Sequence, residues 1–372
     1  MNLLYALWSD CCLSPVNVEG ASRRNRLLEY LNLTTGQGVI ICEPAQVRYL
    51  TGFTGSHATL CGSVAGWSLV TDARYETQAA TECPDVPIMM DRKSFNRCAQ
   101  NLVVEGVNEL WVEESLAAVN YVHAVELFDT VTVNSQALSS LRSIKSPMEL
   151  QAMQAAASIT VAALLGTVEC IELGMSEREI AVALETRFFA EGADGLAFET
   201  IVAAGAHSAI PHHRPSDYQL SKGDLLVIDC GASFAGYRAD MTRTFVAGAE
   251  PTGWQREIHE VVLSAHGVGI ESLSPGRGAA EIDQLVRSRV NAGGYGLEFA
   301  HGTGHGVGLE IHEWPLLVPG AAGTISAGMA LTIEPGVYLV GSGGVRVEDT
   351  VVVTEGLPRI LTESDRALAR VG

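Results

Sequence analysis

The sequence predicts a two-domain protein of the α+β class, in which a smaller α/β domain (residues 1–145) precedes an α+β domain (residues 146–372). The first indication is length, because 372 residues fit two domains at about 100–200 residues each. The second is composition, because 47% of the residues are apolar, which allows sizeable cores and argues against disorder. The third is a strong helix start at Ser146, directly after a segment in which strands and helices alternate.

In the first domain, short apolar segments predict strands over residues 38–42, 58–61, 68–71 and 109–113. A helix is predicted near residues 75–81, between the third and fourth of these strands. Such alternation of strands and helices is typical of an α/β unit.

The second domain opens with a capping box. Ser146 can cap the helix, Pro147 suits its first position, and Glu149 completes the box. The same device recurs at Ser176 with Glu179 and at Thr252 with Gln255. We therefore predict helices over residues 147–173, 177–192, 253–273 and 279–292, packed over an antiparallel sheet that the intervening strands form.

Charge and cysteine content exclude several classes of partner. With 24 Lys and Arg against 43 Asp and Glu, the net charge is −19, so neither a nucleic acid nor an anionic membrane is an expected partner. None of the eight cysteines form a CxxC pair, and we expect reduced thiols in a cytoplasmic protein. No signal peptide or membrane span is expected, because the best apolar stretch, residues 161–168, falls short of the ~18–20 residues that a span needs. The adjacent pair Cys11 and Cys12 suggests no role.

Carboxylates that end or enter strands point to a site in the second domain. An apolar strand ends in Asp229, a glycine-containing turn follows, and the next strand carries Asp240. A hairpin would bring the two carboxylates together, where their repulsion requires a proton or a metal ion between them. The alternative is two exposed aspartates at strand ends. A further apolar strand ends in Glu334, before the turn at Pro335–Gly336.

Histidines and an Arg–Glu pair accompany these carboxylates. His305 lies in a run with glycine at alternate positions, which suits a metal ligand; a glycine-rich loop with incidental histidines is the alternative. Arg346 and Glu348 share one face of a strand, where a plain salt bridge is the alternative. His212 and His213 follow a strand in a turn, where an ordinary surface histidine is the alternative.

Together the four carboxylates and His305 predict a centre for two divalent metal ions. Oxygen-rich ligand sets with a single imidazole suit hard-to-borderline divalent ions such as manganese, cobalt or zinc. The carboxylates carry −4 and two divalent cations +4, so the set would be balanced. A bridging hydroxide between two such Lewis acids is a nucleophile at neutral pH. Cys230, next to Asp229, is expected to pack beneath this site.

The pattern resembles the pita-bread metallopeptidases, which include Xaa-Pro aminopeptidase, Xaa-Pro dipeptidase (prolidase) and methionine aminopeptidase. The resemblance lies in the order Asp229, Asp240, His305, Glu334 and Glu348, within Gly-His-Gly-Val-Gly, Ile-Glu-Pro-Gly and Arg-Val-Glu-Asp. Residues 47–55 and 71–75 resemble the creatinase-type N-terminal domain, which the proline-specific peptidases carry and methionine aminopeptidases lack. The resemblance covers nearly the whole chain. It implies a pita-bread catalytic domain over residues 146–372, preceded by a creatinase-like domain over residues 1–145.

The resemblance also implies a role for each site residue. Asp229 would chelate one metal, Asp240 and Glu348 would bridge both, and His305 and Glu334 would hold the other. Glu334 would move a proton from the attacking water to the leaving amine. His212 and His312 would hydrogen-bond the substrate carbonyl and the tetrahedral intermediate, and Arg346 would orient a metal-bound carboxylate. His213 and His301 are further candidates.

The implied reaction is hydrolysis of the bond between an N-terminal residue and proline, by attack of a metal-bridging hydroxide. The implied substrates are Xaa-Pro dipeptides or short peptides with proline at the second position, and the implied assembly is a homodimer. The sequence does not separate dipeptidase from aminopeptidase, although its compact length and residues 311–315 look closer to short dipeptidase-like bacterial proteins. The alternatives are the same scaffold acting on a non-proline substrate and a catalytically silent binding protein; the intact ligand set argues against the second.

Overall fold

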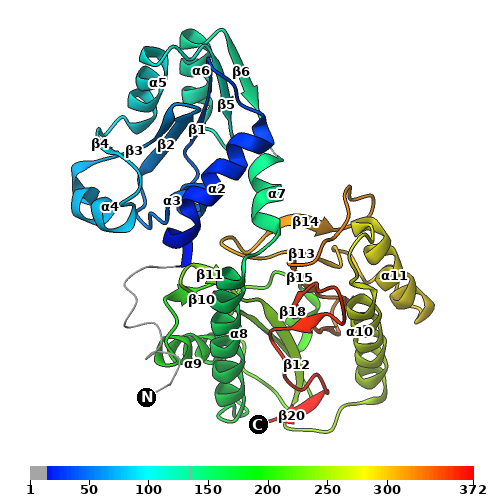
Figure 1. Ribbon diagram of the computed structural model, residues 1–372. Helices are drawn as coiled ribbons and strands as arrows, with labels where there is room; N and C mark the ends of the chain where they lie inside the picture. Colours follow the sequence, from blue (N-terminus) through cyan, green and yellow to red (C-terminus); the bar gives the residue numbers. More distant parts are fainter. Residues whose placement is uncertain (1–14, 135) are drawn as a thin grey trace. The chain divides into compact units, whose positions relative to one another are not determined.

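The computed structural model describes residues 15–134 and 136–372 and divides the chain into two compact units, Met1–Arg142 and Ser143–Gly372 (Figure 1). The sequence placed the domain boundary after residue 145 rather than after residue 142. Cys11 and Cys12 lie outside the described residues.

The N-terminal unit is built on a six-stranded mixed sheet with the strand order β4-β3-β2-β1-β5-β6. Its strands are β1 (Gln37–Ile41), β2 (Ala58–Ser63), β3 (Gly66–Thr71), β4 (Ile88–Met90), β5 (Glu109–Val112) and β6 (Thr130–Val133). Its helices are α2 (Pro15–Leu31), α3 (Pro44–Thr51), α4 (Glu76–Glu82), α5 (Ser94–Val104) and α6 (Ala118–Leu127), and α7 (Ala137–Ser143) lies at the division between the units. The four strands and the helix that the sequence predicted here are confirmed as β1, β2, β3, β5 and α4.

Helices of this unit cover the sheet with apolar side chains. Phe95 and Leu102 of α5 and Ala124 of α6 are buried in one cluster with Ile40 of β1 and Val112 of β5. Since alternate residues of a strand point to opposite faces, this cluster fixes which face of each strand lies inward.

The C-terminal unit contains the four long helices that the capping boxes and periodicity predicted. They are α8 (Pro147–Val168), α9 (Glu177–Ala190), α10 (Gly253–Ser272) and α11 (Ala279–Ala292). The first ends at residue 168 rather than near 173, and the chain then turns at Gly174, which has a φ of 90° and donates its N–H to the Leu220 carbonyl.

Strands of this unit form four sheets: β20-β12-β9-β8, β14-β13-β15-β18-β19, β11-β10-β7 and β16-β17. Their bounds are β7 (Gly195–Leu196), β8 (Ile201–Ala204), β9 (Leu225–Cys230), β10 (Ala232–Phe234), β11 (Tyr237–Arg238), β12 (Met241–Ala247), β13 (Gly304–Gly306), β14 (Glu313–Leu317), β15 (Ala330–Ile333), β16 (Gly336–Leu339), β17 (Gly343–Arg346), β18 (Asp349–Val352), β19 (Arg359–Ile360) and β20 (Ala369–Val371). The predicted antiparallel arrangement holds except between β12 and β20, which pair in parallel.

The two helix pairs pack on opposite faces of the β9–β12 sheet (Figure 1). Phe245 of β12 lies in a cluster with Leu164 of α8 and Phe188 of α9. The next residue, Val246, points the other way and packs with Val262 of α10. Both faces of these strands are therefore buried, which explains the apolar runs over residues 225–228 of β9 and 245–247 of β12.

Among the described helices, α8 is long and apolar enough to cross a membrane by length and composition. Its apolar window is longer than the run over residues 161–168, because alanines contribute over the rest of the 18 residues. Half of that 18-residue window is buried within the protein, as expected for a helix that packs on a sheet.

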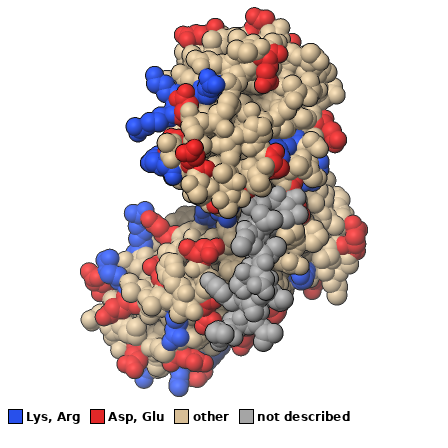
Figure 2. All heavy atoms as spheres, turned by 60° about the vertical axis from the view of Figure 1, so that its left-hand side comes forward, with Lys and Arg blue, Asp and Glu red and all other residues tan. Residues whose placement is uncertain are grey.

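Charged side chains of both signs are interspersed over the described surface of the face drawn in Figure 2. Lys and Arg groups lie among Asp and Glu groups there and do not form one continuous basic area. Proteins that bind nucleic acids instead cluster Lys and Arg into a continuous positive surface that contacts the phosphate backbone.

Candidate metal centre

Five acidic and imidazole side chains of the C-terminal unit converge from separate strands. Asp229 lies in β9, Asp240 precedes β12, His305 lies in β13, Glu334 follows β15, and Glu348 lies between β17 and β18. The register of β9 and β12 places Thr242 opposite Asp229, and an isolated bridge places Thr242 opposite Glu348. Strand pairing thus gathers residues that lie far apart in the sequence.

The glycine run around His305 has a packing reason. A Cβ atom at Gly304 would collide with the Thr332 backbone oxygen, and one at Gly306 would meet the Trp314 backbone oxygen at 2.6 Å. Glycine therefore lets β13 lie close to its neighbours β14 and β15. The groups that approach this backbone are the flanking strands, and His305 is the side chain that the run presents to the centre.

The separations within the cluster are those of ligands around a cation. Asp240, His305 and Glu348 each offer an atom within 4.8 Å of the others. Nε2 of His305 lies 3.7 Å from Oδ2 of Asp240 and 3.5 Å from Oε1 of Glu334. Two atoms that bind one ion at about 2.1 Å in tetrahedral geometry lie roughly 3.4 Å apart, whereas a direct hydrogen bond would be shorter.

Burial and repulsion between the carboxylates raise their pKa values. For Asp240, burial and the charge of Asp229 raise the pKa well above its usual range, and for Glu348 burial and the charge of Asp240 do the same. Burial also raises the pKa of Glu334, against the opposing charges of His301 and Arg346. Because these three adjacent acids resist ionisation, positive charge between them is needed to stabilise their ionised forms.

The donor set fits two divalent cations. Nδ1 of His305 lies 2.9 Å from the Gly306 carbonyl, so its N–H donates there and Nε2 keeps its lone pair toward the carboxylates. Oδ1 of Asp229 is buried and has no hydrogen-bond partner among the described residues. The carboxylates and Arg346 together carry −3, which two divalent ions and one hydroxide would neutralise.

Arg346 is buried beside the centre, and each nitrogen of its guanidinium group has a partner. Nη2 donates to Oδ2 of Asp229 at 2.6 Å, and Nε donates to the Thr242 hydroxyl at 3.0 Å. Nη1 donates to the Tyr338 hydroxyl at 2.9 Å and to the Pro211 carbonyl at 3.4 Å. Arg346 does not pair with Glu348, so the plain salt bridge considered for these two residues is absent among the described contacts. The sequence analysis missed Tyr338 and Thr242, which lack a recognisable motif.

A pocket of about 490 Å³ opens onto the centre and is lined by all five predicted ligands. His212 and His312 also line it, and both are exposed to solvent there. The His312 ring stands perpendicular to that of His305, with ring centroids 4.4 Å apart. Burial and the nearby His305 lower the pKa of His312, which favours the neutral ring. His213 and His301, the further candidates, also line this pocket.

The turn that carries His212 and His213 is tied down by a buried acid that the sequence analysis missed. Glu177, at the first position of α9, is fully buried and accepts a hydrogen bond from the His213 ring at 2.8 Å and lies 2.9 Å from Nδ1 of His207. It also accepts from the backbone N–H and the hydroxyl of Ser216, at 2.9 and 2.6 Å. Burial alone would raise the pKa of Glu177, but the hydrogen bonds from Ser216, Ala204 and His213 lower it, so the group is a carboxylate.

The loop that carries His312 has a buried anchor of its own. Lys145 donates to Oε2 of Glu313 at 2.9 Å, and both side chains are almost fully buried. Oε1 of Glu313 accepts the Glu310 N–H at 3.0 Å. This ion pair fixes the residue next to His312 to the start of the C-terminal unit.

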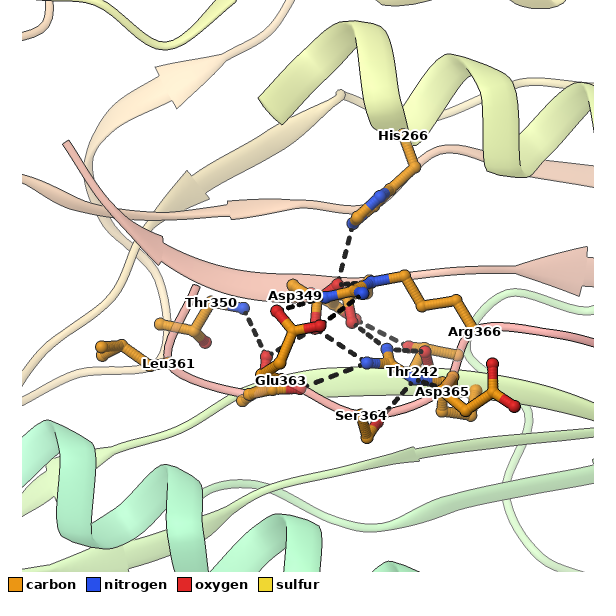
Figure 3. A network of polar contacts seen from close by, with 12 residues as sticks. Thr242, His266, Asp349, Thr350, Leu361, Glu363, Ser364, Asp365 and Arg366 are labelled. Atoms are coloured by element: carbon orange, nitrogen blue, oxygen red, sulfur yellow. Dashed lines mark hydrogen bonds and ion pairs between the residues drawn. The ribbon is translucent and has the colours of Figure 1, made fainter. Parts of the chain in front are cut away.

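A second buried network is centred on Asp349, the residue that follows Glu348 in the chain (Figure 3). Asp349 accepts from Arg243 at 2.9 Å and from Arg366 at 2.6 Å, and Nε2 of His266 lies 3.0 Å from it. Arg243 also donates to the Glu348 carbonyl at 2.6 Å. The network therefore holds the backbone of a predicted metal ligand through residues that do not line the pocket.

Comparisons with known proteins agree with this geometry. Residues 151–355 match metallopeptidase family M24, and residues 23–144 match the Creatinase/Prolidase N-terminal domain. The chain is 35% identical over 354 residues to a Xaa-Pro dipeptidase of Pyrococcus furiosus, covering 93% of this chain and 99% of that protein. A solved Xaa-Pro dipeptidase from Bacillus anthracis superimposes with a TM-score of 0.90 at 33% identity, covering 95% of this chain and 100% of the other. A solved X-Pro aminopeptidase from Thermotoga maritima gives 0.87 at 32% identity, covering 94% and 99%.

Proposed function

This chain belongs to metallopeptidase family M24, and from that premise we propose that it hydrolyses the peptide bond between an N-terminal residue and proline. The fold class and the family that the sequence predicted, a creatinase-type N-terminal domain followed by a pita-bread catalytic domain, are confirmed. The proposal about the substrate is supported by relatives named Xaa-Pro dipeptidase and X-Pro aminopeptidase.

The observation that carries the proposal is the convergence of Asp229, Asp240, His305, Glu334 and Glu348 in one pocket. The family implies a dinuclear metal site, and we propose manganese as the native ion. When bound, two divalent cations would supply a hydroxide nucleophile at neutral pH and polarise the scissile carbonyl.

Within this proposal, the carboxylates share the metal ligation. Asp229 would chelate one cation, while Asp240 and Glu348 would bridge both, which suits their short distance from one another. His305 and Glu334 would hold the second cation, which suits the 3.5 Å between Nε2 and Oε1.

Glu334 is the group best placed to move protons. Its carboxylate lines the pocket beside the proposed cations, where it would accept a proton from the attacking water and release it to the departing proline nitrogen. His212 and His312 would donate to the substrate carbonyl and to the oxyanion that develops from it. Arg346 would orient the Asp229 carboxylate, to which it donates at 2.6 Å.

A metal-dependent site suits the Xaa-Pro bond for a chemical reason. Its tertiary amide has no N–H that an enzyme could use for recognition, and the ring fixes the backbone. A site that polarises the carbonyl and protonates the nitrogen does not depend on that missing donor.

We further propose that the protein works as a homodimer in the cytoplasm.

Hydrolysis of Ala-Pro and Ala-Pro-Ala by the manganese-loaded protein tests this function. We expect cleavage before proline, and we expect Glu334→Gln to lower kcat at least 100-fold, because it removes the proton carrier. Glu355→Gln, the same change at an exposed position, is the control. If the metal-loaded protein cleaves peptides without proline but cleaves neither Ala-Pro nor Ala-Pro-Ala, the result would favour the alternative of a non-proline substrate on the same scaffold.

A further inference from the structure

The pocket contains two permanently positive side chains among the described residues that line it, Arg346 and Arg214. A dipeptide substrate ends in a carboxylate next to the scissile bond, so it brings a negative charge into this pocket. A longer peptide carries that charge further away. The use of the two guanidinium groups therefore bears on the length of the substrate.

Arg346 is already committed to the metal centre. Its side chain is 5% exposed, and its nitrogens donate to Asp229, Thr242, Tyr338 and Pro211. Binding a substrate carboxylate through Arg346 would compete with its short bond to Asp229. The Arg346 guanidinium therefore serves to position Asp229, a proposed metal ligand, and not the substrate.

Arg214 is free to turn toward a substrate. Its side chain is 84% exposed, and its interaction with the described residues is a single ion pair, 3.0 Å to Glu199. Glu199 is 81% exposed and lines the same pocket. An exposed pair of this kind is worth at most about 1 kcal/mol, so a better partner readily replaces it.

The backbone that carries Arg214 is nevertheless held firmly. His213, directly before it, is bound to the buried Glu177, and so is Ser216, two residues after it. The mobile part is then the long side chain, on a fixed base. A guanidinium on a fixed base can bind a carboxylate with two parallel hydrogen bonds, at little cost in backbone ordering.

The charge balance of the pocket gives such a cation a role. Two divalent ions and a hydroxide would neutralise the four carboxylates and Arg346, so the loaded centre offers a substrate carboxylate no surplus positive charge, and the chain as a whole carries a net charge of −19. Attraction of a substrate anion therefore depends on a further local positive charge, which Arg214 supplies.

We propose that Arg214 binds the C-terminal carboxylate of the substrate and makes this pocket selective for Xaa-Pro dipeptides over longer peptides. This inference rests on the proposed Xaa-Pro hydrolysis and adds a determinant of substrate length. Glu199 competes with the substrate for the same guanidinium, and it therefore weakens dipeptide binding.

Steady-state kinetics with Ala-Pro and Ala-Pro-NH2 test the proposal, because the two probes differ only in the terminal charge. For the manganese-loaded wild-type chain we expect a KM for Ala-Pro roughly tenfold below that for the amide, as a charge-assisted bidentate contact would give. Arg214→Met should raise the KM for Ala-Pro about tenfold and remove the preference over the amide. Glu199→Gln should lower the KM for Ala-Pro roughly twofold to fivefold.

The matched control is Arg178→Met. Arg178 forms an exposed ion pair with Asp217, also at 3.0 Å, and does not line the pocket. Its loss should leave both KM values within twofold of the wild type. The proposal is overturned if Arg214→Met changes the KM for the acid and the amide equally, or changes neither. If the wild-type chain cleaves neither probe nor Ala-Pro-Ala, the proposed Xaa-Pro activity itself has failed.

Discussion

Replacement of Asp349 by Asn probes the buried network behind the metal centre (Figure 3). Asp349 is fully buried and lies within hydrogen-bond distance of Arg243, Arg366 and His266. Burial alone would raise the pKa of Asp349, but these partners hold it well below its usual range. The group is therefore an anion in the folded protein, and Asn removes its charge while keeping its size.

The expected loss of stability follows from the arginine that remains. Arg243 is 3% exposed, so without Asp349 its charge stays buried and only partly compensated. Removing one partner from a buried ion network costs about 3–5 kcal/mol. For a unit of this size, each kcal/mol lowers Tm by about 2–4 °C, so Asp349→Asn should lower the melting temperature by roughly 6–20 °C.

The same change should weaken metal binding. Arg243 donates to the carbonyl of Glu348, the proposed bridging ligand, so its displacement moves that residue. Losing support behind a ligand commonly costs 10-fold to 100-fold in metal affinity. We expect a manganese Kd raised by about that factor.

Scanning calorimetry and manganese titration of the full chain measure both effects. Asp365→Asn is the matched control, since Asp365 is an exposed aspartate next to Arg366 and its backbone carbonyl accepts from Arg243 unchanged. If Asp349→Asn shifts Tm and manganese affinity no more than Asp365→Asn does, the network does not support the centre as argued.

Three further predictions follow from other parts of the C-terminal unit. Lys145→Met should lower the unfolding free energy by about 3 kcal/mol, because it removes the cation that is paired with the buried Glu313 carboxylate. Lys145→Met with Glu313→Gln should recover part of that loss in denaturant melts; equal loss in both proteins would contradict the ion pair's role. Glu177→Gln should lower kcat/KM for Ala-Pro at least tenfold, since the histidine turn loses its charged anchor, and Glu179→Gln on the same helix serves as the exposed comparison; equal kinetics would show that the anchor is dispensable. The rise in Tm on adding manganese should be larger at pH 8 than at pH 5.5, because protons compete with the cation for carboxyl groups whose pKa is raised, such as that of Asp240. A rise in Tm that does not depend on pH would contradict the assigned ligands.

The helices of the C-terminal unit were predictable because their start signals are local. Ser146 accepts the Glu149 N–H at 3.2 Å, and Glu149 accepts the Ser146 N–H at 2.8 Å, so the whole device lies within four residues. By contrast, α5 and α6 follow Lys93 and Ala117, neither of which caps its helix with a side chain. Those helices form through packing on the sheet, which a local pattern does not reveal.

The proposed metal ligands could be singled out from the sequence because each one lies in or next to a strand, within a recognisable motif. Their supporting residues could not. Lys145 meets Glu313 across 168 positions, and Arg346 meets Asp229 across 117. Such contacts depend on strand pairing and on loops, so they become visible only once the chain is folded. Glu177 was not singled out, because the helix start was recognised from Ser176 and Glu179, and burial is what turns Glu177 into an anchor.

The most direct test of the account is a titration of the metal-free chain with manganese, during which bound metal and the rate of Ala-Pro hydrolysis are recorded together. The account predicts two ions per chain, activity that rises with their binding, and complete loss of activity when a chelator removes them. Full hydrolysis in excess chelator, or saturation without any metal bound to Asp229, Asp240, His305, Glu334 and Glu348, would contradict it.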